Sequence, residues 1–433
     1  EYQPASTRGE VGPTSTCGLA KLVPSARRAR NRGRLAGVVA MAGRRRRKLD
    51  GPLAWSNWQA QRRHQRLGCG SEVYLYGDGR ASGQIDEGQL GPYELLNPIV
   101  TFGHATPPPP LLLRAWVHLN ADQQHAERGG TTDTSKYHGG WIHDEIASLL
   151  SLLLGTRLRA GGMVRMLPKR RHPGNPRTPM PDETPAPLPR SPRPKLPRQG
   201  GPFVLDDGVV SKLASYANLT AERAVGLARA ARLYRDAIWI GETQPALAWL
   251  MFVSALEAGA NAWEQDTNED RTRVFRAAKP DLAAALDVAD PSGKLARHVA
   301  LELATELKGT RKFLHFVMKF EPKKGPQPRP ERQRYSFIWS RPRLRAAISK
   351  VYEYRSKALH AGIPFPYPMC QAPELLKEGF GPSEVPMGLQ ASAQGGRWVT
   401  EDLPMLLHLF EYLTRDVLLA WWDSMIEGPE TQL

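Results

Sequence analysis

The chain has 433 residues, and 59 Lys or Arg against 43 Asp or Glu give it a formal net charge of +16. This length suffices for two or three domains, while 39 Gly and 38 Pro are many for a fully packed enzyme and predict that part of the chain is unfolded. The three cysteines form no CxxC pair, which argues against a disulfide framework or a cysteine-rich zinc site and fits a reducing compartment.

The positive charge is concentrated in two segments. Residues 1–66 carry a net charge of +12 and residues 156–200 one of +9, while the remainder stands at −5. Basic tails bind phosphate backbones without reading sequence, so a general nucleic-acid binder is one interpretation. The other is a solvated tail or an over-extended gene start, since the first Met is Met41. We expect residues 1–66 to form a basic, disordered tail.

Apolar runs are all shorter than the roughly 20 residues that span a bilayer. The longest near the N-terminus, at 35–43, is short and is followed by four arginines, which makes it a poor signal peptide. We expect a cytoplasmic protein that does not enter the membrane.

Residues 67–167 have the pattern of a small β-rich module that ends in a helix. Strands are expected at 73–76, followed by a hairpin turn at 77–79, and at 99–102 and 111–119. From Ile142 to Leu154 the apolar spacing becomes helical, with acidic residues in the first turn and Gly155 as the stop.

Residues 168–202 have the composition of a linker. Twelve of these 35 residues are proline, a density that disfavours both helix and sheet and favours extended polyproline II structure. A spacer is the expected role, and a Pro-rich ligand for another domain is the alternative.

Residues 203–433 are predicted to be almost wholly α-helical. Helices are expected at 220–240, 243–263, 281–288, 295–307, 311–320, 342–360 and 401–426. The last of these is apolar on most of its circumference, so it must be buried centrally or at a partner surface. The predicted fold class is therefore α+β: a small β-rich N-terminal module, a Pro-rich linker and a C-terminal helical bundle.

Common catalytic motifs are missing from the sequence. There is no GxxxxGK[ST], no GxGxxG after a strand, no HExxH and no GxSxG. A loose set of metal-ligand types, His138, His143, Asp144 and Glu145, includes two acids that equally suit the first turn of a helix. We expect no metal and no cofactor.

Arg355 and His360 stand near the end of a predicted helix, in Tyr-Arg-Ser-Lys-Ala-Leu-His-Ala-Gly at 354–362. Arginine matches phosphate oxygens, and histidine as a residue type acts as acid or base near neutral pH. RNA supplies its own 2′-hydroxyl nucleophile, so these two residue types suit cleavage without a metal. Positions five apart lie about 140° from each other on a helix. The two side chains can share one site only if the helix ends or distorts near His360, where Gly362 provides a stop.

Glu257 is the only charged residue between positions 246 and 262. A lone carboxylate on an apolar helix is either paired or exposed to water. We expect it to pair with Arg355 and orient the guanidinium. Tyr354 and Lys357 are candidate substrate contacts, with a core tyrosine and a solvated lysine as the alternatives.

These segments resemble ApeA-like HEPN proteins. Trp-Leu-Met-Phe-Val-Ser-Ala-Leu-Glu at 249–257 is similar to the second helix of that family, and 355–362 with 413–422 is similar to its C-terminal part. The resemblance covers roughly residues 203–427. It implies a HEPN helical bundle in which Arg355 stabilises the phosphate, His360 is the general acid or base and Glu257 is an accessory orienting group.

The resemblance also implies a function, a metal-independent endoribonuclease of phage defence or toxin-like growth arrest. HEPN nucleases pool two Arg/His pairs in a homodimer, so we expect RNA as substrate and a homodimer through the helical bundle, with the apolar last helix as a contact. The alternative is a non-catalytic HEPN-like module that binds RNA, a nucleotide or a partner. Ser356 favours it, because many HEPN nucleases have Asn, Asp or His directly after the arginine.

Overall fold

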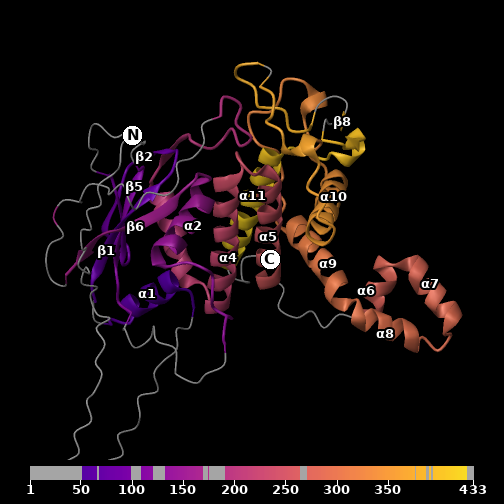
Figure 1. The fold of residues 1–433 in the computed structure, drawn as a ribbon. Coiled ribbons are helices and arrows are strands. Elements are labelled where there is room, and N and C mark those ends of the chain that lie inside the picture. The colour runs from indigo at the N-terminus through magenta and orange to yellow at the C-terminus, as the bar shows by residue number, and fades with distance from the viewer. Residues whose placement is uncertain are drawn as a thin grey trace, which may run out of the picture. The chain divides into compact units, whose positions relative to one another are not determined.

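The computed structural model describes residues 51–65, 68–98, 109–119, 132–168, 174, 191–263, 271–375, 377–386, 390–391 and 394–426. They form an antiparallel β-sheet region, between residues 70 and 167, followed by a largely helical region (Figure 1). The predicted α+β fold class is confirmed. The predicted tail up to residue 50 and the predicted strand at 99–102 lie outside the described residues.

The main sheet has five antiparallel strands in the order β3-β4-β5-β1-β6. Its strands are β1 (Gly70–Tyr76), β3 (Ile85–Leu90), β4 (Tyr93–Leu96), β5 (Leu111–Trp116) and β6 (Arg159–Leu167). The central strand β1 pairs with β5 on one side and with β6 on the other, so Val73 lies opposite both Leu113 and Met163. Two of the predicted strands are confirmed in β1 and β5.

The predicted hairpin turn at 77–79 is wrong. The strand after it, β2 (Arg80–Ser82), does not return along β1 but pairs in parallel with β7 (Pro202–Val204). Gly79 lies close to this pairing, because a Cβ there would be 2.9 Å from the Phe203 ring and 3.1 Å from the Gly201 carbonyl oxygen. The Gly-rich turn therefore joins two sheets instead of closing a hairpin.

The helical region follows the sequence pattern closely. Its helices are α3 (Asp207–Ser215), α4 (Ala221–Ile240), α5 (Pro245–Trp263), α6 (Arg271–Ala278), α7 (Pro280–Ala289), α8 (Lys294–Glu302), α9 (Ala304–Lys319), α10 (Arg341–His360) and α11 (Leu407–Ile426). The hydroxyl of Thr220 caps α4, as predicted. A two-stranded sheet, β8 (Gln390–Ala391) with β9 (Arg397–Trp398), precedes α11. Among the described helices, none combines the length and apolar composition needed to cross a bilayer.

Several elements differ from the predictions. The helices predicted at 295–307 and 311–320 are instead α8 and α9, which are divided at Leu303, and α3 and α6 were not predicted. The last helix begins at Leu407 and not at residue 401, because Pro404 follows the short 3-10 turn Thr400–Asp402. Within the predicted tail, residues 53–62 form helix α1 (Leu53–Arg62), which buries two tryptophans. The last part of the predicted linker packs against the helices, since Leu196 is buried and its amide donates to the Glu242 carboxylate.

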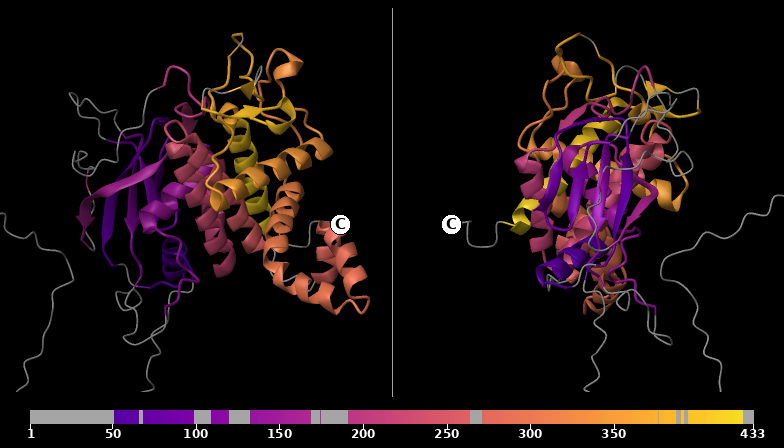
Figure 2. Two further views of the ribbon diagram at one scale, coloured as in Figure 1. Left: turned by 45° about the vertical axis from the view of Figure 1, so that its right-hand side comes forward. Right: turned by 90° about the vertical axis from the view of Figure 1, so that its left-hand side faces the viewer.

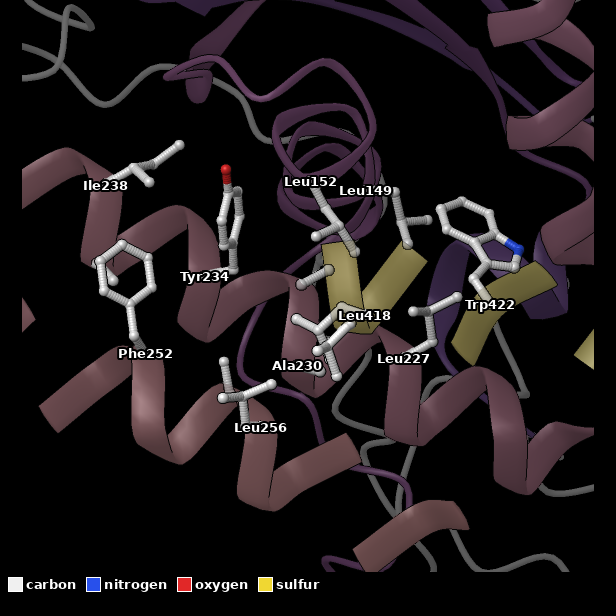
Figure 3. Packing of buried hydrophobic residues seen from close by; sticks show 14 of the residues in the cluster. Leu149, Leu152, Leu227, Ala230, Tyr234, Ile238, Phe252, Leu256, Leu418 and Trp422 are labelled. Carbon is white, nitrogen blue, oxygen red and sulfur yellow. The ribbon is translucent and has the colours of Figure 1, made fainter. Parts of the chain in front are cut away.

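Helix α2 (Ile142–Leu154) joins the sheet to the helices. It was predicted with these bounds, and it ends at Gly155, whose φ of +63° favours glycine. It contacts β5 and β6 on one side and α4 and α11 on the other (Figure 2). Figure 3 shows Leu149 and Leu152 of α2 near Leu227 of α4 and Trp422 of α11. The inner face of the sheet and the helical region consequently share one continuous hydrophobic core.

The outer face of the sheet carries a buried ionic network. Glu72 accepts hydrogen bonds from Arg114 at 2.8 Å and from Arg165 at 2.6 Å, and Arg114 also donates to Glu94 at 2.7 Å. Glu72 is fully buried, and such a carboxylate is tolerable only with this many donors. The network therefore links four adjacent strands, β4, β5, β1 and β6.

A buried carboxylate fixes α1 against α2. Glu145 accepts hydrogen bonds from the Ala54 amide at 2.9 Å, the Trp55 amide at 3.2 Å and the Tyr216 hydroxyl at 2.7 Å. Burial raises the pKa of Glu145 to about 7, although these hydrogen bonds act in the opposite direction. The free N-terminal amides of α1 thus compensate part of the cost of burying Glu145.

Trp249 is the aromatic centre of the helical region. It is fully buried, and its ring stacks on Phe410 at 4.7 Å and on Phe365 at 5.2 Å between centroids. Its Nε1 donates to the Met369 carbonyl oxygen at 3.3 Å. This side chain therefore connects α5, α11 and the segment after α10.

We expect Trp249→Ala to lower the free energy of unfolding by about 3–5 kcal/mol, because it leaves a large cavity and removes two ring contacts. Urea unfolding followed by circular dichroism measures this. Trp141→Ala is the control, since Trp141 is 72% exposed and should change stability by less than about 0.5 kcal/mol. Equal effects of the two substitutions would contradict the packing described.

Acid should destabilise the fold. Burial lowers the pKa of His138, His143 and His408 to about 4 from their ordinary value of 6.5. Between pH 6.5 and 4 these histidines bind protons in the unfolded chain but not in the native protein, so the free energy of unfolding falls as the pH falls. Glu145 opposes this between pH 4.5 and 7, because its raised pKa makes the native state hold a proton that the unfolded state has lost. Burial also raises the pKa of Glu384 and Glu411, which oppose the histidines in the same way. Hydrogen bonds lower the pKa of Asp287, Asp290 and Glu353, which act with the histidines, so the six groups that make acid destabilising outweigh the three that oppose it.

The thermal midpoint should therefore drop between pH 7 and pH 4, and His408→Gln should flatten this dependence by removing one titrating group. His298→Gln, at an exposed position, is the control and should leave the slope unchanged. A slope that is the same in wild type and His408→Gln would show that His408 is not held neutral by burial.

Candidate functional site

Helix α10 positions the predicted site residues. Its buried face consists of Leu344, Ala347, Ile348, Val351 and Tyr354, at the three- and four-residue spacing of an amphipathic helix. This face packs against α5 and α9. Arg355 follows the last of these buried residues, so it emerges at the edge of the core.

Glu257 of α5 pairs with Arg355, as predicted. The Arg355 Nη2 donates to Glu257 Oε2 at 2.8 Å, and the two side chains are 20% and 19% exposed. The second carboxylate oxygen, Oε1, accepts a hydrogen bond from the Tyr352 hydroxyl at 3.0 Å. Arg355 and Tyr352 thus hold the carboxylate from one helix.

Tyr352 was not identified from the sequence, although it lies three residues before Arg355 and so on the same side of α10. The guanidinium carbon of Arg355 is 5.5 Å from the centre of the Tyr352 ring, within cation–π distance. Burial, followed by the negative charge of Glu257, raises the pKa of Tyr352. The phenol therefore stays protonated and acts as a donor to Glu257.

The guanidinium of Arg355 is not saturated by these contacts. Its Nε is buried without a hydrogen-bond partner, and its Nη1 makes no hydrogen bond within the described part of the chain. A partly exposed, pre-oriented cation with unused donors is suited to bind an oxyanion such as a phosphate.

His360 is not brought to this cluster within one chain. Helix α10 continues through His360 and ends only at Ala361 and Gly362, whose φ is +67°. The side chains of Arg355 and His360 therefore leave the helix about 140° apart. The imidazole is exposed, and no hydrogen bond joins it to Arg355 among the described residues. The distortion that a shared site within one chain requires is absent from α10.

The two candidate substrate contacts lie in different surroundings. Tyr354 is 7% exposed, and its hydroxyl donates to the Asp402 carbonyl oxygen at 2.7 Å. Burial raises the pKa of Tyr354 to about 12. Tyr354 is therefore a core residue whose hydroxyl is already used. Lys357 is exposed and pairs with Glu353 at 2.6 Å, one turn earlier on α10.

The four residues predicted as possible metal ligands, His138, His143, Asp144 and Glu145, do not all contact the same groups. His143 Nε2 lies 2.8 Å from the Ser71 hydroxyl, and Asp144 accepts the Trp141 amide at 3.0 Å. His138 Nε2 lies 3.3 Å from Glu145, whose other contacts tie down α1. In the parts of the chain that the structure describes, no three such side chains are placed to hold a metal ion.

The last helix is buried centrally, which is one of the two placements predicted for it. Helix α11 packs against α2, α4 and α5, and its large apolar side chains, such as Phe410, Leu413 and Trp422, are fully buried within the chain. Exposed apolar side chains lie instead around the end of α10. Leu359, Ile363 and Tyr367 are 52%, 54% and 41% exposed, and they flank His360 in sequence. We call these three residues the α10 patch.

Comparison of the chain with protein families, with curated proteins and with solved structures found no match. Of the predicted residues, the structure brings Glu257 and Arg355 together and adds Tyr352. It leaves His360 on another side of the helix and Tyr354 in the core.

A double-mutant cycle with Glu257→Gln and Arg355→Met should give a coupling free energy of about 1 kcal/mol, because this half-buried pair has a close, oriented contact. Urea unfolding of the four proteins measures it. The exposed pair Glu353–Lys357, one turn apart on α10, is the matched control and should couple by only about 0.3–0.5 kcal/mol. A weaker coupling at Glu257–Arg355 than at the control pair would show that the guanidinium is not held in place.

Proposed function

We propose that the chain is a metal-independent endoribonuclease of the HEPN type, active as a homodimer in the cytoplasm. The observation that carries the proposal is the partly exposed guanidinium of Arg355, which donates to Glu257 at 2.8 Å. The helix that carries Arg355, α10, ends in the exposed His360. The resemblance of these segments to ApeA-like HEPN proteins supports the same function. A role in phage defence or toxin-like growth arrest follows from that resemblance alone.

The proposed reaction needs only groups that this chain can supply. The 2′-hydroxyl oxygen of RNA attacks the adjacent phosphorus, the bond to the 5′-oxygen breaks, and a 2′,3′-cyclic phosphate and a 5′-hydroxyl form. A base takes the 2′ proton and an acid returns a proton to the 5′-oxygen. His360 performs one of these transfers, and Arg355 neutralises the charge that develops on the phosphorane. Glu257 is a positioning residue, because it acts through Arg355.

A second copy of the chain resolves the separation of Arg355 and His360. One imidazole cannot perform both proton transfers at once, and within one chain it faces away from the guanidinium. The three residues of the α10 patch are exposed apolar side chains close to His360 in sequence, and exposed apolar side chains are suited to protein contacts. In the proposed dimer, a two-fold contact through this patch places the His360 of each copy near the Arg355 of the other copy. The imidazole and the guanidinium of one site then come from different chains.

A non-catalytic module that binds RNA, a nucleotide or a partner is the second candidate. The divergence of Arg355 and His360 on a regular helix favours it, as does Ser356. In that function Arg355 binds a phosphate, and His360 is simply a solvated residue at the helix end, where its position beside the last carbonyl groups is favourable.

The purified full-length chain should cleave a labelled single-stranded RNA in EDTA and leave 2′,3′-cyclic phosphate ends. Arg355→Ala and His360→Ala should each slow cleavage by about 100-fold or more, since each removes transition-state charge stabilisation or proton transfer. Glu257→Gln should lower the rate less and mainly through the rate at saturating RNA, because the guanidinium remains but is no longer oriented. Gel analysis of the products gives all three rates.

Arg345→Ala, at an exposed position on the same helix, and His298→Ala, on α8, are matched controls that should cleave at the wild-type rate. Sedimentation velocity on the same samples reports whether dimers form. Intact RNA in the presence of dimeric wild type would contradict the nuclease and leave the binding module.

A further inference from the structure

A second candidate site lies where the last turns of α5 meet the first turns of α4, and it shares no residue with the Arg355–Glu257 cluster. A pocket of about 510 Å³ opens between the 132–141 loop, the first turns of α4 and the last turns of α5. Lys136, Glu222, Gly226, Arg229, Asn261 and Ala262 are among the residues that line it. This volume is within the range of about 300–1,000 Å³ that is typical of small-molecule sites.

The pocket is held open by its own structure. Its floor is made of small residues where α4 and α5 approach closely, since a Cβ on Gly226 would lie 2.2 Å from the Cβ of Ala262. Its wall is fixed by Arg229, whose guanidinium donates to the carbonyl oxygens of Thr134, Ser135 and Tyr137 at 2.9 Å each. A preformed cavity does not need to be ordered by its ligand, which favours binding.

Three of the polar side chains that line the pocket, Lys136, Glu222 and Asn261, are exposed to solvent. They offer an ammonium, a carboxylate and an amide around a floor of alanine, valine and glycine. A second cation, Arg229, lies at the same wall.

These groups match the parts of a nucleotide. Small and apolar residues of the lining, such as Val225 and Gly226, can contact the face of a base, and the Asn261 amide can both donate to and accept from a base edge. Lys136 suits the phosphate, and Glu222 suits a ribose hydroxyl or an exocyclic amine. The same loop exposes Tyr137 by 69% and Trp141 by 72%, and exposed aromatic rings stack on bases.

We propose that this pocket binds a nucleotide, either free or as an unpaired residue of an RNA strand. The site shares no residue with the Arg355–Glu257 cluster, so it does not depend on the proposed cleavage activity. Its ligand is recognised through the base and one phosphate, which a free mononucleotide and a single-stranded RNA both present.

Binding is tested with the full-length chain carrying Arg355→Ala, which prevents cleavage of the probes. The probes are AMP, GMP, CMP and UMP in calorimetry, and a fluorescein-labelled ten-nucleotide RNA in anisotropy, both at 100 mM salt. Asn261→Leu and Lys136→Glu should each weaken binding by about tenfold or more, as expected for loss of one base-edge or phosphate contact. Asn218→Leu and Lys319→Glu, both exposed and outside the pocket, should bind within about twofold of the parent.

Each outcome decides the proposal. Site-dependent binding of a mononucleotide supports it with a free nucleotide as the ligand, and site-dependent binding of the RNA alone supports it with an RNA residue as the ligand. No binding of either probe overturns it, and so does binding that the pocket variants leave unchanged. If the wild type cleaves RNA and Asn261→Leu does not change binding, the pocket is rejected and the nuclease is kept. If the wild type does not cleave RNA and Asn261→Leu weakens binding, the nuclease is rejected and the pocket is kept.

Discussion

Burial of helix α2 on all sides is the constraint on which the rest of the structure depends. The helix is apolar around most of its circumference, so neither the sheet nor the helices can satisfy it alone. The sheet covers one side with β5 and β6, and α4 and α11 cover the other. Glu145, the one carboxylate that α2 carries into this interior, is tolerated because α1 supplies two free amides to it. Sheet, helices and α1 are therefore fixed by one element.

The candidate site depends on this interior indirectly, through helices α5 and α10. Helix α5 is held by Trp249 between Phe365 and Phe410, and α10 is held against α5 by the row that ends in Tyr354. Arg355 and Glu257 meet at the rim where these two helices leave the core, which explains why both are about one-fifth exposed. A residue deeper in the core could not reach a phosphate, and one farther out would have no partner to orient it.

Helix bounds were predictable where the signals are local. Thr220, Gly155 and Gly362 act on their own turns of backbone, and α2, α4 and α10 begin and end close to the predicted residues. Strand pairing was not predictable, because β2 pairs with β7, about 120 residues later in the chain. Helix α1 was missed since its two tryptophans lie among many basic residues and its support, Glu145, is 90 residues away.

The site was predictable in part for the same reason. Glu257 was expected to be paired because it is the single charge between positions 246 and 262, and Arg355 was the partner proposed. The direction of the His360 side chain depends on where α10 ends. Because α10 is helical through His360 and Gly362 lies after it, the imidazole is not turned toward Arg355.

The core that α2 builds has a topological consequence for the proline-rich segment. The described residues up to 168 and those from 191 onward are held together by side-chain packing and by the β2–β7 pairing. A protease cut in that interval would leave two fragments that stay associated under native conditions and separate only in denaturant. Two genes encoding the halves should likewise reconstitute the protein by fragment complementation.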